Sequence, residues 1–289
     1  MPTSEKVDFV AEVSSNHNRN LSRCLEFIRV ASDIGCAAVK FQLFKIDQLF
    51  APEIIQKSEE HRQRKAWELP VDFIPALSEC CKEQGVQFAC TPFYLQAVEE
   101  LYPYVDFYKI ASYELLWDDL LKECARTKKP VALSTGMATM EEVSRAVDII
   151  REEGCTDLIL LHCVSGYPTP PGECNLRAIK TLRDSFLCPV GWSDHSVSAA
   201  VIYRAINAWQ ASMIEFHLDL DSQGVEYATG HCWLPEGIQT VIQTVKESCV
   251  ADGNGEKVPV PSELDDRAWR ADPSDGLRPM LSMRRMWKG

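Results

Sequence analysis

The sequence lacks long hydrophobic runs, C-x-x-C cysteine motifs and an excess of positive charge. None of the apolar stretches in its 289 residues approaches the roughly 18 residues that a membrane-spanning helix needs. The N-terminal stretch MPTSEKVDFV enters an expected strand at once, which leaves no room for a secretory leader. A formal net charge of −12 argues against nucleic acid or an anionic membrane as a general partner. An anionic ligand would therefore have to be held by local positive charge.

The cysteines are numerous but scattered. There are 12, none of them in a C-x-x-C pair, and several lie in strand-like or helix-like runs where a free cysteine behaves as a small hydrophobic residue. We therefore expect a reduced, cytoplasmic protein whose thiols are structural rather than reactive.

Short β-branched or aromatic runs alternate with longer segments whose apolar residues recur with helical spacing. Alternating strands and helices favour parallel βα units, and eight such units predict a (β/α)8 barrel, the TIM-barrel class of α/β fold. The expected strands are 7–13, 37–42, 86–91, 106–112, 130–135, 157–163, 188–194 and 212–218.

An open, doubly wound sheet is the alternative fold. It would call for a Gly-rich turn after the first strand, and the stretch AEVSSNHNRN is not one. A hydrophobic fraction of 46% suffices for a single large core. We therefore predict one barrel domain over residues 1–250, followed by a linker and a short irregular tail over residues 251–289.

In a barrel of this kind, chemistry collects at the C-terminal ends of the strands. His195 and His217 end the last two expected strands, so their imidazoles are placed to converge on one divalent ion. Two core histidines held by hydrogen bonds are the alternative interpretation. His162 has a similar position, but we interpret it as a structural histidine.

Two lysines inside expected strands, Lys40 and Lys109, are costly to bury without an anion. They indicate a phosphate or carboxylate ligand, assisted by the hydroxyl groups of Ser112 and Ser134; a Schiff-base lysine is the competing interpretation. Two carboxylates, Glu12 and Glu114, are candidate general bases, or alternatively ion-paired or helix-terminal groups. Like the two lysines and the two serines, both carboxylates lie near the ends of expected strands.

The expected strand ends carry a series of motifs, which in order are AEVSSNHN, AAVKFQLFK, FACTPF, FYKIASYEL, LSTGMATMEE, LHCVSGYPTP, GWSDHS and IEFHLDLD. Taken together, these stretches resemble the sialic acid synthase family, the phosphoenolpyruvate-dependent synthases of nine-carbon keto-sugar acids. The resemblance covers roughly residues 8–245. It implies the same barrel and a condensation in which C3 of phosphoenolpyruvate attacks the open-chain aldehyde of an N-acylated hexosamine. Water then adds at C2 and phosphate leaves by C–O cleavage.

The resemblance also implies roles for individual residues. His195 and His217 match the ligands of a divalent ion, expected to be manganese, with magnesium or cobalt as alternatives. Glu114 matches the carboxylate that deprotonates the attacking water, and Glu12 matches an acid close to the acceptor carbonyl. Tyr167 and Gln42 match residues near the reacting centre, and Gln42 is assigned to the sugar. The substrates implied are phosphoenolpyruvate and an aldose, bound by a cytoplasmic homodimer. The phosphoenolpyruvate contacts implied are Lys40, Lys109, Ser112, Ser134 and Ser165.

The sequence departs from the family pattern in several places. Ser165 stands where the family commonly has asparagine, and Gly224-Val225-Glu226 stands where it has G-P-D, which makes Glu226 the candidate sugar contact. An unfamiliar stretch, YATGHCWLP, follows. We expect no antifreeze-like domain, which in the family lends an arginine to the partner's sugar site. One hypothesis is that the tail 263–289 covers a barrel mouth and brings Arg270 or Arg278 to the acceptor; a solvated tail is the alternative.

Two other functions remain open at this point. A metal-dependent aldolase or isomerase on the same barrel would not need the lysines and serines together. A catalytically silent, sugar-binding relative would not need the histidines, Glu114 and both lysines. The sequence leaves the identity of the sugar acceptor open.

Overall fold

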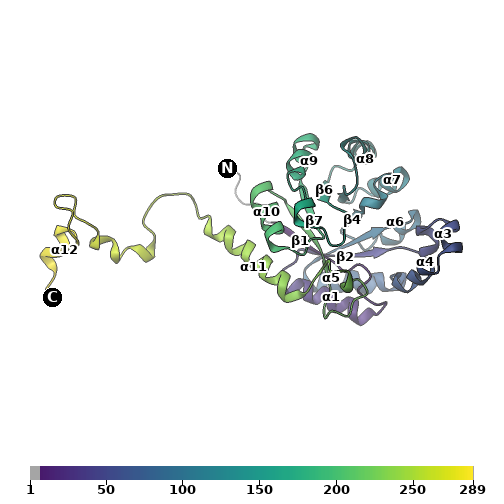
Figure 1. Cartoon of the computed structure of the whole chain (residues 1–289), viewed down its shortest axis with the longest axis horizontal. Helices are drawn as coiled ribbons and strands as arrows, with labels where there is room; N and C mark the ends of the chain where they lie inside the picture. Colours follow the sequence, from purple (N-terminus) through teal and green to yellow (C-terminus); the bar gives the residue numbers. More distant parts are fainter. Residues whose placement is uncertain (1–6, 289) are drawn as a thin grey trace. The chain divides into compact units, whose positions relative to one another are not determined.

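The computed structural model describes residues 7–288 (Figure 1). The chain divides into two compact units, the first ending at Lys246 and the second beginning at Glu247. This division lies within helix α11 (Pro235–Ala251), as does the predicted one after residue 250. No helix among residues 7–288 is long and apolar enough to cross a membrane.

The first unit is a closed parallel barrel. Strands β1 to β8 pair in chain order, and β1 also pairs with β8, which closes the sheet and confirms the predicted (β/α)8 fold. A two-residue strand, β9 (Cys232–Trp233), adds to β8 and was not predicted. The barrel strands are β1 (Asp8–Glu12), β2 (Ala38–Leu43), β3 (Gln87–Pro92), β4 (Phe107–Ile110), β5 (Val131–Ser134), β6 (Leu158–Cys163), β7 (Val190–Asp194) and β8 (Met213–Leu218).

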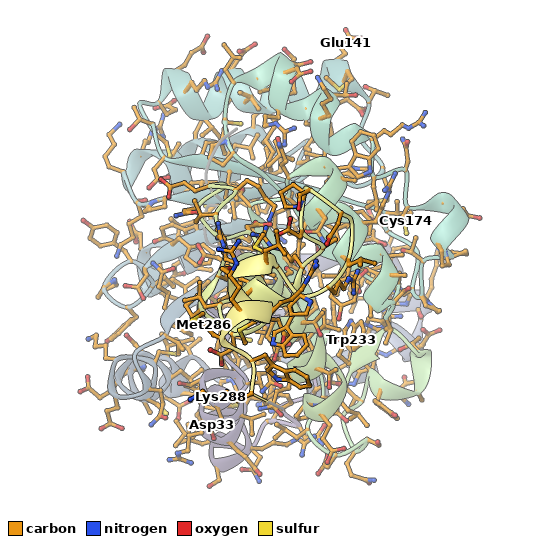
Figure 2. All side chains as sticks on the ribbon, turned by 90° about the vertical axis from the view of Figure 1, so that its left-hand side faces the viewer. Asp33, Glu141, Cys174, Trp233, Met286 and Lys288 are labelled. Carbon is orange, nitrogen blue, oxygen red and sulfur yellow. The ribbon has the colours of Figure 1, made fainter. Side chains whose placement is uncertain are left out.

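Helices surround the sheet in Figure 1, and their ends follow local sequence signals. The side chain of Asn20 caps the first helix, Thr139 and Glu142 form a capping box on α8, and Gly85 ends α5 in the left-handed conformation. Charged side chains such as Asp33 and Glu141 project outward from this layer (Figure 2). The helices of the first unit are α1 (Leu21–Asp33), α2 (Ile46–Leu49), α3 (Pro52–Lys57), α4 (Glu59–Gln63), α5 (Ile74–Gln84), α6 (Leu95–Leu101), α7 (Asp118–Arg126), α8 (Met140–Glu152), α9 (Ala178–Phe186), α10 (Ala199–Trp209) and α11.

Strand alternation explains where the polar residues lie. Side chains at every second strand position point into the barrel, and the others pack against the helices. A small apolar cluster fills one layer of the interior, and it is separate from the large cluster between sheet and helices. Two residues further along several strands, the same face carries a buried charge or hydroxyl. Examples of these steps are Val10 to Glu12, Ala38 to Lys40, Phe107 to Lys109, Ala132 to Ser134 and Met213 to Glu215.

The second unit consists of short elements. Two 3-10 turns, Pro261–Glu263 and Asp266–Trp269, precede α12 (Leu281–Met286). Asp272 accepts hydrogen bonds from the backbone of Ser274 and Leu281, and Arg284 pairs with Asp275. The hypothesis that this segment covers a barrel mouth stays a prediction.

Candidate functional site

Buried lysines and glutamates form a paired network inside the barrel, beyond the apolar layer. Lys40 is ion-paired with Glu12, and its Nζ lies 3.9 Å from Oε2 of Glu215. The Nζ of Lys109 lies 3.0 Å from Oε1 of Glu215, which also accepts a hydrogen bond from Ser193. The anion that each lysine requires is thus supplied, in part, by the protein itself. Glu215 is not among the residues to which the sequence analysis gave a role.

The protonation of this network follows from its charges. Burial lowers the pKa of Lys40, but Glu12 and Glu215 outweigh burial and raise it above its usual range. Burial raises the pKa of Glu215, whereas Lys109 and Lys40 outweigh it and lower that pKa to about 2. Lys40 therefore stays charged, which opposes a Schiff-base role for it because such a role needs a neutral amine.

Serine hydroxyls lie at or just after the ends of β4, β5 and β6. We call Ser112, Ser134, Gly136 and Ser165 the hydroxyl cradle. The Oγ of Ser112 accepts a hydrogen bond of 3.0 Å from the backbone of Gly136. A Cβ atom on Gly136 would lie 2.6 Å from Oγ of Ser165 and 2.8 Å from Oγ of Ser112, so only glycine fits. Among residues 7–288, the buried Oγ atoms of Ser134 and Ser165 have no hydrogen-bond partner. The cradle therefore offers free hydroxyls to a ligand.

Glu114 lies next to this cradle, in the 3-10 turn Ser112–Glu114 that follows β4. It is buried, and its Oε2 has no hydrogen-bond partner within the described part of the chain. Burial raises the pKa of its carboxyl group to about 7, although the charge of Lys109 lowers it in part. A carboxyl group that titrates near neutral pH is suited to general acid–base work.

His195 ends β7 and has a defined tautomer. Its Nδ1 lies 2.8 Å from the carbonyl oxygen of Val164, and a carbonyl only accepts, so Nδ1 carries the proton and Nε2 is left with a lone pair. Burial, with the nearby His217, lowers the pKa of His195 to about 3, which keeps the ring neutral. The ring of Tyr167 lies 4.2 Å from that of His195, centroid to centroid.

His217 belongs to a group that sequence reasoning did not assemble. We call His217, Glu226, His231 and Cys232 the four-residue cluster; each offers a possible ligand atom, and these atoms lie within 4.8 Å of one another. The ring centroids of His195 and His217 are 5.3 Å apart, but this group of the described residues does not contain His195. His162 lies elsewhere, with Nε2 hydrogen-bonded to the carbonyl oxygen of Cys174.

The long loop after β8 brings Glu226 into the cluster. The backbone N–H of Glu226 donates to Oδ1 of Asn16 at 2.9 Å, while Nδ2 of Asn16 donates to the carbonyl oxygen of Leu218. A Cβ atom on Gly224 would lie 2.4 Å from both Asn16 Oδ1 and Asp219 Oδ1. The loop can pass this close only because residue 224 is glycine.

Side chains on both sides hold Glu226 in place. Ser14 donates a hydrogen bond to its Oε1, and Gln42 donates to Ser14 at 3.2 Å and to Glu12 at 2.9 Å. Gln42 and Glu226, the residues expected to contact the sugar, are therefore linked through Ser14. Burial raises the pKa of Glu226, but His217 and His231 outweigh it and hold that pKa well below its usual range.

Asp194 ties the end of β7 to β9. Its carboxylate accepts hydrogen bonds from the indole N–H groups of Trp192 and Trp233, at 3.0 and 3.1 Å, and from the hydroxyl group of Ser196. Trp233, labelled in Figure 2, directly follows Cys232 in β9. The loops that carry His195 and the four-residue cluster are therefore fixed to the same buried carboxylate.

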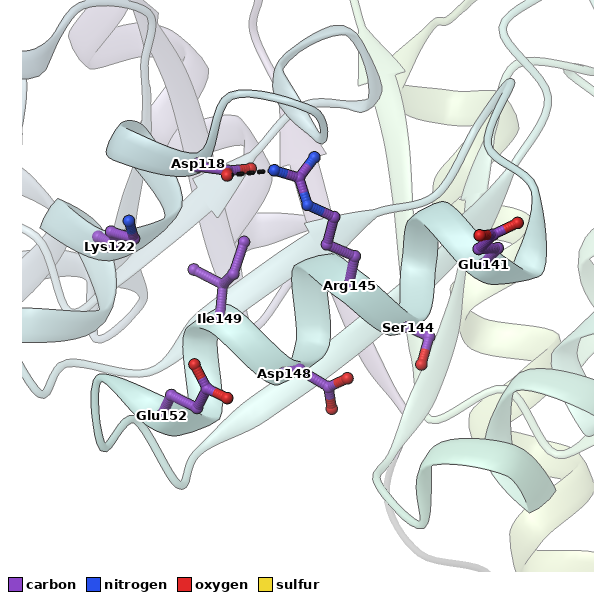
Figure 3. A pocket seen from close by; sticks show the side chains of 8 residues that line it. All are labelled: Asp118, Lys122, Glu141, Ser144, Arg145, Asp148, Ile149 and Glu152. Carbon is purple, nitrogen blue, oxygen red and sulfur yellow. Dashed lines mark hydrogen bonds and ion pairs between the residues drawn. The ribbon is translucent and has the colours of Figure 1, made fainter.

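A hollow lies on the outside of the barrel, between α7 and α8 (Figure 3). Arg145 on α8 pairs with Asp118 on α7 across it. The other charged groups that line the hollow are mostly acidic, and they come from the outer helices rather than from strand ends. This hollow lacks the convergent groups found at the end of the barrel. It is lined by Asp118, Lys122, Glu141, Ser144, Arg145, Asp148, Ile149 and Glu152.

The fold and these strand ends define a parallel α/β barrel with a side of serine hydroxyls and lysine and a histidine-rich side at one end. Residues 27–257 match the NeuB family, and the chain belongs to that family. It is 34% identical to the N,N'-diacetyllegionaminic acid synthase of Legionella pneumophila, over 90% of this chain and 77% of that protein. It is 30% identical to the pseudaminic acid synthase of Helicobacter pylori, over 91% of this chain and 80% of that one.

A solved structure has the same fold. The N-acetylneuraminic acid synthetase of Leptospira borgpetersenii, crystallised with citrate, superposes with a TM-score of 0.80 at 29% identity, over 91% of this chain and 90% of that chain. The family resemblance seen in the strand-end motifs is thereby confirmed.

Proposed function

We propose that this chain is a nonulosonic acid synthase. It condenses phosphoenolpyruvate with the aldehyde of an N-acylated amino sugar and releases phosphate, giving a 3-deoxy-2-keto sugar acid. The observation that carries the proposal is a pair of unpartnered buried hydroxyls, on Ser134 and Ser165, at the ends of strands that follow the one carrying the buried Lys109 in a NeuB-family barrel. Beside them, burial raises the pKa of the Glu114 carboxyl group to about 7.

The anionic substrate occupies the cradle side. Free hydroxyls on Ser134 and Ser165 donate to its phosphate group, and Lys109 supplies positive charge close by. Glu12 holds Lys40 in an ion pair. Lys40 balances the negative charge of the interior and provides a positive charge for the carboxylate of the substrate. Ser165 replaces the amide expected in this family, and a hydroxyl group at that position still serves as a donor.

Proton movement falls to Glu114. C3 of phosphoenolpyruvate attacks the aldehyde carbon, water adds at C2, and the bond between C2 and the bridging oxygen breaks as phosphate departs. Glu114 in its ionised form accepts a proton of that water and releases it again. Of the two protons of the water, one ends on the former aldehyde oxygen, which becomes a hydroxyl group, and the other on the departing phosphate. Glu12, Gln42 and Tyr167 border the acceptor aldehyde, and Glu226 orients this side through Ser14.

The donor set fits a divalent ion. Neutral imidazoles bind metals, and burial lowers the pKa of His195. The buried Nδ1 of His217 is without a hydrogen-bond partner among residues 7–288. The family resemblance assigns the ion to His195 and His217, and Glu226 adjoins His217. Such an ion would act as a Lewis acid on a carbonyl oxygen.

A phosphate-release assay tests the proposal. Purified protein is incubated with phosphoenolpyruvate and, in separate reactions, N-acetylmannosamine, diacetamido-dideoxyhexoses and smaller aldoses, with and without added manganese. We expect phosphate only when an acceptor is present, together with a keto acid product. Aldol cleavage or isomerisation of the sugar without phosphate release would favour the aldolase or isomerase instead, and sugar binding without turnover a silent relative. A homodimer and a cytoplasmic location stay predictions.

A further inference from the structure

The four-residue cluster contains two residues, His231 and Cys232, that the proposed function does not use. Cys232 on β9 pairs in parallel register with His217 on β8. Register partners in a parallel pair point to the same side of the sheet, so the thiol and the imidazole face the same space. The potential ligand atoms of His217, Glu226, His231 and Cys232 all lie within 4.8 Å of one another.

Glu226 stands between the two histidines. Its Oε2 lies 3.3 Å from Nδ1 of His217 and 3.5 Å from Nε2 of His231, while its Oε1 is occupied by Ser14. The first of these distances is a charge contact rather than an aligned hydrogen bond, because His217 Nδ1 remains without a hydrogen-bond partner among the described residues. A separation of 3.3 Å between an oxygen and a nitrogen matches two ligand atoms of one cation, each about 2.0–2.2 Å from it.

His231 and Cys232 are both buried, and part of the bonding capacity of each remains unused. Nδ1 of His231 has no hydrogen-bond partner within residues 7–288. The Sγ of Cys232 has a weak contact of 3.5 Å with Nδ2 of Asn16. A buried imidazole and a buried thiol beside an ionised carboxylate are the donor types that transition metals bind.

We propose that His217, Glu226, His231 and Cys232 together bind one divalent transition-metal ion, with the Cys232 thiolate as a ligand. A sulfur ligand favours Zn²⁺, Fe²⁺ or Co²⁺ and disfavours Mg²⁺, which prefers oxygen. The chain thereby replaces a site of two histidines with one of four protein donors. Glu226 binds through one oxygen only, so a five-coordinate ion keeps one position for a substrate oxygen.

The proposal rests on the proposed function only for the use of the ion in catalysis; binding of the ion is independent of it. Its alternative is a site of His195 and His217 in which Cys232 takes no part. The two differ in one direct respect: only a thiolate ligand gives a sulfur-to-metal charge-transfer band when Co²⁺ is bound.

The test uses full-length protein freed of metal with a chelator and titrated with Co²⁺, followed by absorption spectroscopy. We expect saturation at one ion per chain and a sulfur-to-cobalt band in the near ultraviolet. Cys232→Ser removes the band, whereas Cys188→Ser, which alters a partly exposed cysteine before β7, retains it. His231→Ala weakens Co²⁺ binding at least about tenfold, and His61→Ala on α4 does not. Circular dichroism confirms that each variant is folded.

Three results would overturn the proposal: no charge-transfer band in the wild type, a band that survives Cys232→Ser, or Co²⁺ binding that depends on His195 and not on His231. The phosphate-release assay is run on the same samples. A band without turnover leaves the metal site standing and refutes the proposed function. Turnover without a band, or with a band that persists in Cys232→Ser, supports the proposed function and refutes the metal site.

Discussion

The two sides of the barrel end are built in different ways. The hydroxyl cradle and Lys109 come from residues at or just after three successive strands, β4 to β6. The four-residue cluster comes from β8 and from a loop that returns past Asn16 before it forms β9. The first side depends on strand periodicity, and the second depends on contacts between segments about two hundred positions apart.

The two sides also differ in which polar groups lack a partner. Around the four-residue cluster, the carboxylates of Glu226 and Asp194 each accept several hydrogen bonds, whereas Nδ1 of His217 and Nδ1 of His231 have no partner within residues 7–288. In the cradle, the hydroxyls of Ser134 and Ser165 have no partner in the same part of the chain. Each buried unsatisfied polar group costs about 1–3 kcal/mol. Each side therefore gains stability from a ligand of its own kind, an anion that accepts from hydroxyls on one side and a cation that binds imidazoles on the other.

The largest expected effect comes from His217→Ala, because His217 is shared by the two-histidine site and the four-residue cluster. We expect turnover to fall at least about a thousandfold, which corresponds to about 4 kcal/mol, and metal content to fall with it while the fold is kept. His195→Ala, measured in parallel by elemental analysis, sharpens the comparison: it removes the metal if the two-histidine site is correct and leaves it bound if the cluster is correct. Unchanged metal content in His217→Ala would exclude both.

Glu114→Gln should lower turnover about a hundredfold or more and change the pH profile. With a pKa near 7, wild-type Glu114 gains its base form as pH rises, so kcat/KM climbs through about pH 7. Because the pKa of Glu114 is higher in the folded protein than in the unfolded chain, the free energy of unfolding falls as the pH rises from about 4.5 to about 7. The loss reaches about 3 kcal/mol and persists at higher pH. Denaturation at pH 5 and pH 8 should therefore show the variant gaining stability relative to wild type at the higher pH. A wild-type profile without a step near 7 would contradict the role.

Lys109→Met should raise the KM for phosphoenolpyruvate more than that for the sugar. It removes a charge-assisted contact of about 1.5–3 kcal/mol and leaves Glu215 without that partner. Lys122→Met, on the outer helix α7, is the matched control. If Lys109→Met keeps its phosphoenolpyruvate affinity but wild type alone is trapped by borohydride, Lys109 instead forms a Schiff base.

Two glycine substitutions separate the sides from each other. Gly136→Ala pushes a Cβ atom against Ser112 and Ser165, and Gly224→Ala pushes one against Asn16 and Asp219. We expect the first to raise the KM for phosphoenolpyruvate about tenfold with metal affinity unchanged, and the second to weaken metal binding with little change in that KM, because small displacements at a site are costly. Gly172→Ala, where nothing lies within 4 Å, is the control. If both variants lose both properties equally, the two sides are not separable.

The smallest effect is expected from the tail. The sequence-based hypothesis gives residues 263–289 a part in acceptor binding, through Arg270 or Arg278. Truncation after residue 262 should then lower kcat/KM for the sugar several-fold, with the phosphoenolpyruvate KM retained. Full efficiency in the truncated protein would remove the tail from the site.

Sequence reasoning predicted the barrel because alternation along strands is a local signal. Lys40, Lys109 and Ser134 each sit two residues after an apolar interior position, so periodicity alone places them inside. Glu215 gives the same signal in the run MIEFHL. What periodicity could not supply is its partner, because the pairing of Glu215 with Lys109 joins strands that are distant in sequence.

Strand periodicity could not predict the four-residue cluster either, because the cluster also depends on contacts between distant segments. His231 and Cys232 follow a loop without periodicity, and they enter the site through the pairing of β9 with β8 and the hydrogen bonds of Asn16. The stretch YATGHCWLP was recognisable in the sequence as a departure from the family pattern. A histidine and a cysteine side by side in such a departure are a signal that metal-ligand chemistry could have been sought there.

The most direct test of the central claim uses phosphoenolpyruvate labelled with oxygen-18 at the bridging oxygen between C2 and phosphorus. Mass spectrometry of the phosphate released in the presence of an N-acylated amino sugar follows that atom. The account predicts that the label appears in the phosphate, because the C–O bond breaks and water supplies the new oxygen at C2. Unlabelled phosphate, or no acceptor-dependent phosphate at all, would contradict it.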